Sequence, residues 1–199
     1  MVDHSILTDV LKAEQQALGT LVATQPTNTN IFIALLRQTT GKVVFSGLGK
    51  SWHVAQLLAA TFSSLQIPSY ALHATEALHG DAGILQSPDT VVVISKSGKG
   101  AELAAMLRVA EKKGCRNALL TCDSGDLATQ VEVAVVLPLQ REAGIYGIVP
   151  TSSIVVMISF GHAVALQIAS ENGFVPDHFA QVHPAGSLGV ALHRNKKEE

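Results

Sequence analysis

Five short apolar runs, separated by helical patterns, constrain the fold of this chain more than any other feature of its sequence. The runs are largely apolar, with many β-branched residues in three of them, and span residues 42–47, 68–74, 90–95, 117–123 and 131–139. They lack the polar alternation of a strand with one solvated face, so both faces of each strand should be covered. Helices are predicted at 53–65 and 99–113 between them. This alternation predicts an α/β fold with a doubly wound, mostly parallel five-stranded sheet and flanking helices.

Helical patterns also flank the sheet region. After the last strand, residues 151–173 form a long, almost wholly apolar helix that Thr151 or Ser152 is expected to cap. A helix this apolar is expected to be buried on all sides. The expected division of the chain is a helical N-terminal arm at 1–40, the sheet domain at 41–192 and a charged tail at 193–199.

Composition narrows the classes of partner. Charged residues make up 15% of the 199 residues and the net charge is -2, which argues against a nucleic-acid surface or a basic membrane patch. The mean hydropathy is +0.30, yet no uninterrupted apolar run reaches the roughly 18 to 20 residues of a membrane span. Surplus apolar surface is therefore expected in contacts between copies of the chain. The two cysteines lack CxxC spacing, which favours a reducing, cytoplasmic location.

Two turns rich in serine and glycine follow predicted strands, in VVFSGLGKS and in VVVISKSGKG. In an open α/β sheet, ligands bind outside the carboxyl ends of the strands. The second turn leads into a helix whose first N–H groups favour an anion, and Ser95, Ser97 and Gly98 add hydroxyl donors and room for close approach. Ser46 can act in the same way in the first turn. These parts suit a phosphate monoester.

The simpler reading of these turns is that serine and glycine merely cap two helices. Neither turn matches the GxGxxG or GxxxxGK[ST] motif, which disfavours a dinucleotide or a nucleoside triphosphate. A third serine-rich segment, at 151–153, opens the long apolar helix. Three such segments together favour phosphate binding over capping alone.

Five ordered blocks carry a resemblance to a known family. They are GLGKSWH, EALHGDAGIL, ISKSGKGAEL, EAGIYGIVPTSS and FAQVHPAGSLG. Together they resemble the sugar isomerase (SIS) domain of arabinose-5-phosphate isomerases over about residues 40 to 190. The resemblance implies metal-independent interconversion of D-ribulose 5-phosphate and D-arabinose 5-phosphate without a cofactor. It also implies a homo-tetramer and a supply of product for the sugar Kdo of lipopolysaccharide or capsule.

The resemblance also implies which residues form the site. The implied catalytic residues are Lys50, Glu102, Glu142 and His183. The residues expected to bind phosphate or substrate are Ser46, Gly47, Ser51, Ser95, Ser97, Gly98, Thr151, Ser152, Ser153 and His79. The chain departs from the usual family motifs at Trp52, Lys96 and Lys99, at EAGIYG and at HPAG. These departures leave the implied catalytic groups in place, and Trp52 and Lys99 bear on substrate fit.

Each implied catalytic residue has an expected role in moving a carbonyl between C1 and C2 through a cis-enediol. A carboxylate with a pKa near neutrality, raised by partial burial, would carry the proton. We favour Glu142 over Glu102, which the pattern places on the second turn of a helix and which has the alternative of a solvated surface charge. His183 would move protons between the oxygens or open the ring, reaching the site of a neighbouring subunit. Lys50 would face an anion or the enediolate oxygen.

Other readings stay open from sequence. His79 and His183, with a carboxylate, would form an inhibitory zinc site, since the reaction itself needs no metal. The chain could be a non-catalytic SIS module that senses a phosphosugar, or an isomerase for another phosphosugar. The four catalytic groups occur together without a helix-turn-helix or other output segment, which favours the enzyme.

Overall fold

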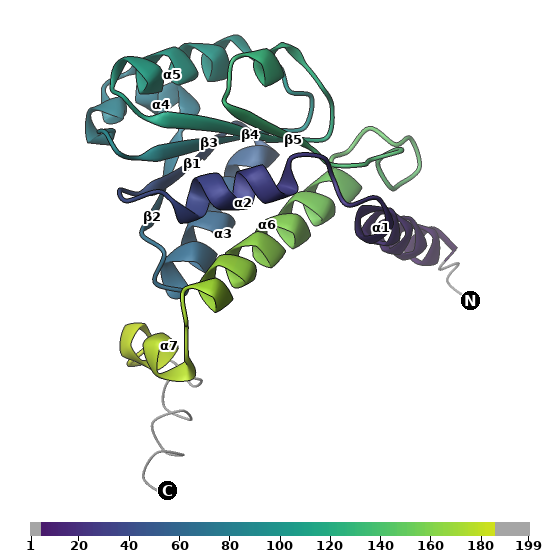
Figure 1. Cartoon of the computed structure of the whole chain (residues 1–199). Helices are drawn as coiled ribbons and strands as arrows, with labels where there is room; N and C mark the ends of the chain where they lie inside the picture. Colours follow the sequence, from purple (N-terminus) through teal and green to yellow (C-terminus); the bar gives the residue numbers. More distant parts are fainter. Residues whose placement is uncertain (1–4, 186–199) are drawn as a thin grey trace, which may run out of the picture.

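The computed structural model describes residues 5–185, and its centre is one five-stranded sheet (Figure 1). The strands are β1 (Val43–Gly47), β2 (Ser69–His73), β3 (Thr90–Ser95), β4 (Arg116–Thr121) and β5 (Val133–Val136). Their order is β2-β1-β3-β4-β5 and every neighbouring pair is parallel. All five predicted strands and the doubly wound architecture are confirmed.

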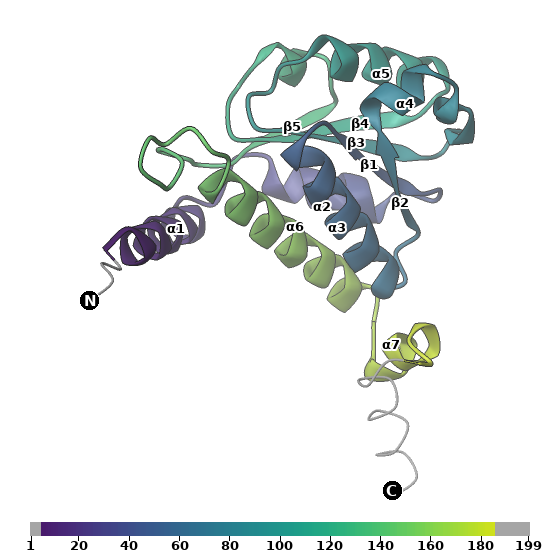
Figure 2. The same ribbon diagram turned by 180° about the vertical axis from the view of Figure 1, so that it is seen from behind.

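Helices cover both faces of the sheet (Figures 1 and 2). One face carries α2 (Thr29–Arg37), α3 (Lys50–Ser64) and α6 (Ser152–Glu171). The other carries α4 (Ala74–Leu78), α5 (Ala101–Lys112) and the short 3-10 helix η1 (Asp81–Ile84), and a second 3-10 helix, η2 (Asp126–Thr129), precedes β5. Because the sheet is covered on both faces, two hydrophobic clusters form, one on each face, while the edge strands β2 and β5 stay partly exposed.

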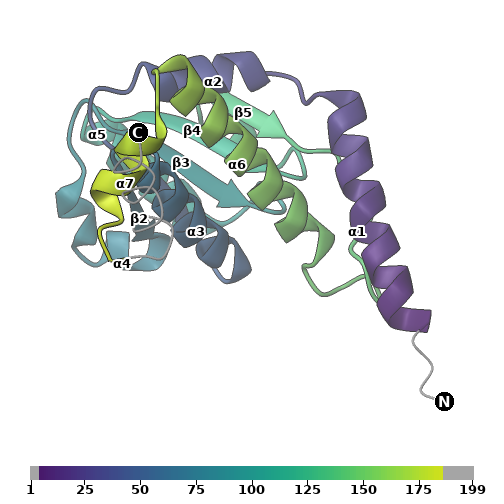
Figure 3. The ribbon, with the colours of Figure 1, turned by 90° about the horizontal axis from the view of Figure 1, so that it is seen from below.

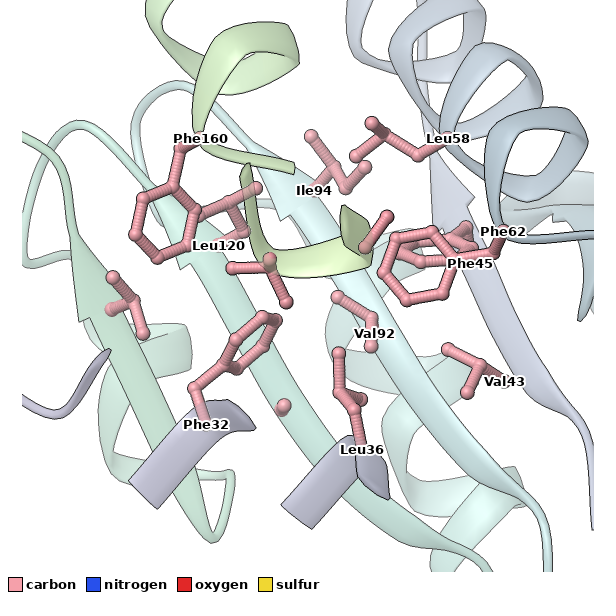
Figure 4. Close-up of a cluster of buried hydrophobic side chains, with 14 of the residues drawn as sticks. Phe32, Leu36, Val43, Phe45, Leu58, Phe62, Val92, Ile94, Leu120 and Phe160 are labelled. Atoms are coloured by element: carbon pink, nitrogen blue, oxygen red, sulfur yellow. The ribbon is translucent and has the colours of Figure 1, made fainter. Parts of the chain in front are cut away.

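The pleat of β1 divides its side chains between the two clusters. Val43 and Phe45 join the cluster under α2, α3 and α6, where the rings of Phe45 and Phe62 meet edge to face at 4.9 Å (Figure 4). Val44 lies on the opposite face, under α4 and α5. By the same two-residue period, Ser46 faces the α5 side. The alternation of side chains along β1 therefore determines whether Ser46 can reach a ligand.

The N-terminal segment divides into two helices with different environments. α2 belongs to the core, because Phe32, Leu35 and Leu36 are buried. α1 (Ser5–Thr24) has no buried residue and runs along the side of the molecule (Figure 3). The projecting part of the expected arm is therefore α1, and the expected tail lies outside the described residues.

The long apolar helix α6 differs from expectation. It is long and apolar enough to cross a membrane by length and composition, which the sequence had argued against, but 56% of that stretch is buried inside the chain. Met157 and Phe160 pack into the core, whereas Leu166 on the outer side is 58% exposed. The expectation of burial on all sides is wrong for the single chain, because α6 forms part of its outermost layer.

Glycines shift the start of the second predicted helix. α5 begins at Ala101 rather than at residue 99, because Gly98 (φ 63°) and Gly100 (φ 144°) hold the chain in conformations that other residues rarely adopt. Glu102 therefore lies on the first turn of α5, not on the second. α3 begins at Lys50, three residues earlier than predicted.

The strand order places a switch point between β1 and β3. The chain leaves β1 into α3 on one face and leaves β3 into α5 on the other. The two loops diverge at the carboxyl ends of these strands, which is where open α/β sheets bind ligands. Both serine and glycine turns lie at this edge.

Candidate functional site

The turn after β3 is anchored to the loop after β4. Cys122 donates its backbone N–H to the Lys96 carbonyl at 3.1 Å, and Leu127 donates to the Gly98 carbonyl at 2.9 Å. A side chain at Gly98 would place its Cβ 2.6 Å from the Asp123 carbonyl oxygen. Residues 95–100 therefore form a fixed turn that requires glycine at position 98.

The two serines of this turn differ in access. Ser97 is exposed at the tip. Ser95 is 6% exposed and its hydroxyl donates to the Lys99 carbonyl at 3.4 Å, inside the turn. Ser97 is thus the more accessible of the two predicted phosphate donors.

The turn after β1 places a cation at the same edge. Lys50 is exposed at the first residue of α3, and Ser51 is half-buried beside it. Gly47 lies directly under this helix start, since a Cβ there would come 2.9 Å from the Ser51 backbone. Ser46 is fully buried and its hydroxyl donates to Met106 Sδ at 2.9 Å. It points into the interface between the sheet and α5, so the expectation that Ser46 contacts a ligand is wrong.

Glu142 is a buried carboxylate at the start of α6. Its side chain is 1% exposed. The backbone N–H groups of Thr151 and Ser153 donate to Oε2 at 2.9 and 3.0 Å. Oε1 forms an ion pair with Lys96 Nζ at 2.8 Å and accepts no further hydrogen bond among the described residues. Glu142 therefore satisfies the N-terminal donors of α6 and joins that helix to the turn after β3.

The expected near-neutral pKa of Glu142 is wrong in this state. Burial alone raises the pKa of this carboxyl group. The Lys96 ammonium and the backbone N–H groups of Ser153 and Thr151 outweigh burial and lower the pKa from 4.5 to about 2. With these contacts Glu142 is held as a carboxylate and is a weak proton acceptor.

Side chains at the serine-rich start of α6 form hydrogen bonds with the preceding loop. Thr151 has no side-chain cap hydrogen bond, and its hydroxyl donates to the Ala143 carbonyl at 3.1 Å. The Ser152 hydroxyl accepts from the Ala143 N–H at 3.2 Å, and Ser153 is fully buried. The expected cap by Thr151 or Ser152 is wrong, because Glu142 takes that role. The hydroxyl groups of Thr151 and Ser152 therefore hold the 142–151 loop, whereas the Ser153 hydroxyl is buried and has no hydrogen-bond partner among the described residues.

An open cleft of about 520 Å³ lies beside Glu142. Lys96 and Ser97 of the β3 turn, Asp123 of the β4 loop, and Arg141 next to Glu142 line it. The cleft therefore joins the accessible part of the serine and glycine turn to the buried carboxylate. A small anionic ligand has room beside the turn, while the Glu142 carboxylate next to it is buried and paired with Lys96.

The remaining expected site residues are distributed over two edges. Glu102, on the first turn of α5, and His79, directly after α4, are exposed on the side where the strands end. His183 follows α7 (Pro176–Val182), where its ring stacks on Phe179 at 3.8 Å and its Nε2 lies 3.4 Å from Ser64 Oγ. Ser64 ends α3, so His183 lies at the edge where the strands begin.

This arrangement separates His183 from the other expected groups within one chain. His79 and His183 lie at opposite edges, so one chain does not form the expected zinc site from them. Within residues 5–185, no cluster of three or more His, Cys, Asp or Glu side chains is placed to hold a metal ion.

The structure adds two features that the residue patterns did not assign. Lys96, noted only as a departure from the usual motif, contacts Glu142 directly. Trp52 meets the ring of His73 edge to face at 5.1 Å, beside the turn after β1. The signal for Lys96 was a cation between two serines, but its carboxylate partner lies 46 residues later in the chain and only folding brings them together.

The lowered pKa of Glu142 predicts that the free energy of unfolding depends on pH. A carboxyl group whose pKa is depressed in the folded state stabilises the protein above its unfolded pKa, and that contribution is lost as the pH falls through the folded value. Relative to Glu142→Gln, the wild-type chain should therefore lose about 3 kcal/mol of unfolding free energy between about pH 5 and pH 2. Urea unfolding across this range measures the difference.

The control for this experiment is Glu132→Gln. Glu132 pairs with Arg116 at 2.9 Å, but both side chains are about half exposed, so that pair should contribute less than about 1 kcal/mol. A wild-type advantage over Glu142→Gln that does not change with pH would contradict the assignment.

Comparison with known proteins places the chain among SIS proteins. The SIS domain model matches residues 35–167. Arabinose 5-phosphate isomerase KdsD of Escherichia coli O6:H1 (strain CFT073) is 35% identical over 92% of this chain and 56% of its own length. An uncharacterised protein, RP505, of Rickettsia prowazekii is 34% identical over 94% of this chain and 59% of its own length. The chain thus spans a little over half the length of these curated relatives.

A solved structure agrees with the sequence matches. The structure of E. coli CFT073 c3406 in complex with arabinose 5-phosphate superposes with a TM-score of 0.87 at 35% identity. The match covers 89% of this chain and 95% of that chain. The two chains therefore share one fold over most of their length.

Proposed function

This chain belongs to the SIS domain family, and on that premise we propose that it is an aldose-ketose isomerase interconverting D-ribulose 5-phosphate and D-arabinose 5-phosphate. The observation that carries the proposal is the open cleft beside Glu142, which links a serine and glycine turn to a buried carboxylate. The similarity to KdsD and to the solved complex with arabinose 5-phosphate supports the choice of substrate.

The phosphate is proposed to bind at the turn after β3. Ser97 is exposed there, and α5 begins directly after the turn with N–H groups that favour an anion. Gly98 lets the turn pack against the backbone of the β4 loop, and the hydrogen bonds to that loop keep the turn fixed. Lys50 lies on the other side of the switch point, where an exposed ammonium can face the sugar oxygens.

The proposed chemistry is a proton transfer between neighbouring carbons. Starting from the open-chain aldose, a carboxylate removes the C2 proton. The C2–H electron pair forms the C1–C2 double bond while the C1=O π pair moves onto O1, which gives a cis-enediolate. His183 is assigned the transfer of the O2 proton to O1, which leaves the negative charge on O2. O2 then forms the C2 carbonyl as the C1–C2 π pair takes the proton back from the carboxylic acid at C1. Lys50 stabilises the negative charge on oxygen, and we assign the carboxylate to Glu142.

The chain is proposed to act as a homo-tetramer with shared active sites. Apolar side chains are exposed on α1 and in the loop after Glu142, where Leu11 is 59%, Ile145 70% and Tyr146 81% exposed. Exposed apolar surface of this kind is typical of contacts between proteins. His183 lies at the far edge of its own sheet, so in this proposal it serves a neighbouring subunit. We place the enzyme in the cytoplasm, as a source of arabinose 5-phosphate for Kdo.

A turnover assay tests the proposed function. Purified protein in metal-free buffer is incubated with arabinose 5-phosphate, and formation of ribulose 5-phosphate is followed. Turnover that persists with chelator present is the expected result. Binding of arabinose 5-phosphate without any turnover would reject the isomerase and favour a phosphosugar-sensing module.

A further inference from the structure

Lys96 connects the proposed phosphate site to the proposed base. Its backbone is fixed, because the Lys96 carbonyl accepts hydrogen bonds from the Cys122 N–H at 3.1 Å and the Thr121 hydroxyl at 3.3 Å. Its side chain, in contrast, is 42% exposed and crosses to Glu142 at the mouth of the cleft. The ammonium can therefore move while the turn that carries it stays in place.

We propose that Lys96 changes partners when a phosphosugar binds, moving from its ion pair with Glu142 to the ligand phosphate. This inference rests on the proposed phosphate site, and it adds a binding residue that lies between Ser95 and Ser97 but is not part of the expected phosphate set. Lys96 becomes both a contact to the phosphate and a positioning residue for Glu142.

The exchange follows from the charges and contacts in the cleft. A phosphate monoester carries close to two negative charges at neutral pH, and Glu142 carries one. A phosphate on the 95–98 turn lies beside the residue that bears the ammonium, whereas Glu142 is reached only across the cleft. When Lys96 leaves, Glu142 still accepts the N–H groups of Thr151 and Ser153, so its position on α6 is kept.

The departure of Lys96 changes the protonation behaviour of Glu142. Besides Lys96, the charged or titratable groups that line the cleft with Glu142 are Asp123, Arg141 and Cys122. Burial and the neighbouring Glu142 raise the pKa of the Cys122 thiol to about 12, so it is neutral at pH 7. Without the ammonium, the burial of Glu142 and the nearby phosphate charge both raise its pKa. The carboxylate thus becomes a stronger base only when substrate is present.

The test measures the pKa of Glu142 with and without a ligand that cannot react. Arabinitol 5-phosphate lacks the carbonyl group, and arabinitol lacks the phosphate as well, so the two separate phosphate binding from sugar binding. The carboxyl carbon of ¹³C-labelled Glu142, assigned with Glu142→Gln, is titrated by NMR. Saturation with arabinitol 5-phosphate should raise its pKa by at least about one unit, and arabinitol should not.

Variants of Lys96 decide whether the lysine causes this change. Lys96→Met should show a raised Glu142 pKa without ligand, no further rise of a full unit with arabinitol 5-phosphate, and binding weakened by about three- to tenfold. Lys96→Arg, which keeps the charge, should restore the ligand-dependent rise. Lys99→Met removes a neighbouring exposed cation from the same turn and should leave the pKa of Glu142 in the ligand-free protein unchanged.

The results that overturn the inference are specific. They are an unchanged Glu142 pKa in the wild-type protein saturated with arabinitol 5-phosphate, or an equal rise in Lys96→Met. Neither result depends on turnover. If the chain binds phosphosugars without isomerising them, the proposed function fails while the partner exchange can still be observed. If it isomerises them and the pKa does not move, only the exchange is rejected.

Discussion

Glu142→Gln should lower the isomerase kcat by about 10³-fold or more while arabinose 5-phosphate still binds measurably. An amide of nearly the same shape keeps an oxygen for the N–H groups of Thr151 and Ser153, so the start of α6 should stay formed. The amide cannot accept the C2 proton, and loss of a positioned general base typically costs 10² to 10⁴ in rate. Steady-state kinetics and isothermal titration measure the two effects separately.

Glu102→Gln is the matched control for this assignment. Glu102 lies at the same edge of the sheet but is exposed on the first turn of α5. Its replacement should reduce kcat by about tenfold, as expected for a group that assists without carrying the C2 proton. If Glu102→Gln abolishes turnover while Glu142→Gln retains it, the base has been assigned to the wrong glutamate.

Mixing two inactive variants should restore activity. Lys50→Met and His183→Asn should each lose at least about 10²-fold alone, because each removes a group that handles charge or protons in the reaction. If His183 completes a neighbouring subunit's site, an oligomer of both variants contains some sites with both native residues. When the two variants assemble at random, half of the subunit pairs contain one chain of each. One of the two sites in such a pair has both native residues, so up to about a quarter of wild-type activity should return.

The placement of His183 in the single chain motivates this experiment. His183 contacts Phe179 and Ser64 at the edge where the strands begin, whereas Lys50 lies where they end. Exchange of subunits is verified by mass spectrometry of differently tagged chains. Confirmed mixed oligomers without activity, or a fully active His183→Asn variant, would remove His183 from the shared site.

The sheet was predictable from sequence because burial on both faces leaves a direct record in the residues. The buried strands β1 and β3 are short runs rich in Val that lack polar alternation, and all five predicted runs contain a strand. The serine and glycine turns were predictable for a different reason, because a chain that leaves a strand into a fixed turn needs residues such as Gly98. Parallel order then places both turns at one edge.

The electrostatic state of the site was not predictable, because it depends on contacts between distant segments. A glutamate in a glycine-flanked loop suggested a partly buried base with a raised pKa. Folding instead brings Lys96 and the first N–H groups of α6 to Glu142, and together they outweigh burial. The side to which Ser46 points was decided by the pleat of β1, which follows from the sheet and not from the turn motif.

Isotope transfer tests the proposed proton transfer most directly, because it reports on the C2–H bond that the Glu142 carboxylate is proposed to break. Wild-type protein is incubated with arabinose 5-phosphate in D₂O, and the ribulose 5-phosphate formed is analysed by NMR for deuterium at C1. A carboxylate that exchanges its proton with solvent during some turnovers predicts deuterium at C1, increasing with repeated turnover. Ribulose 5-phosphate that stays free of deuterium after many turnovers would contradict proton transfer by Glu142.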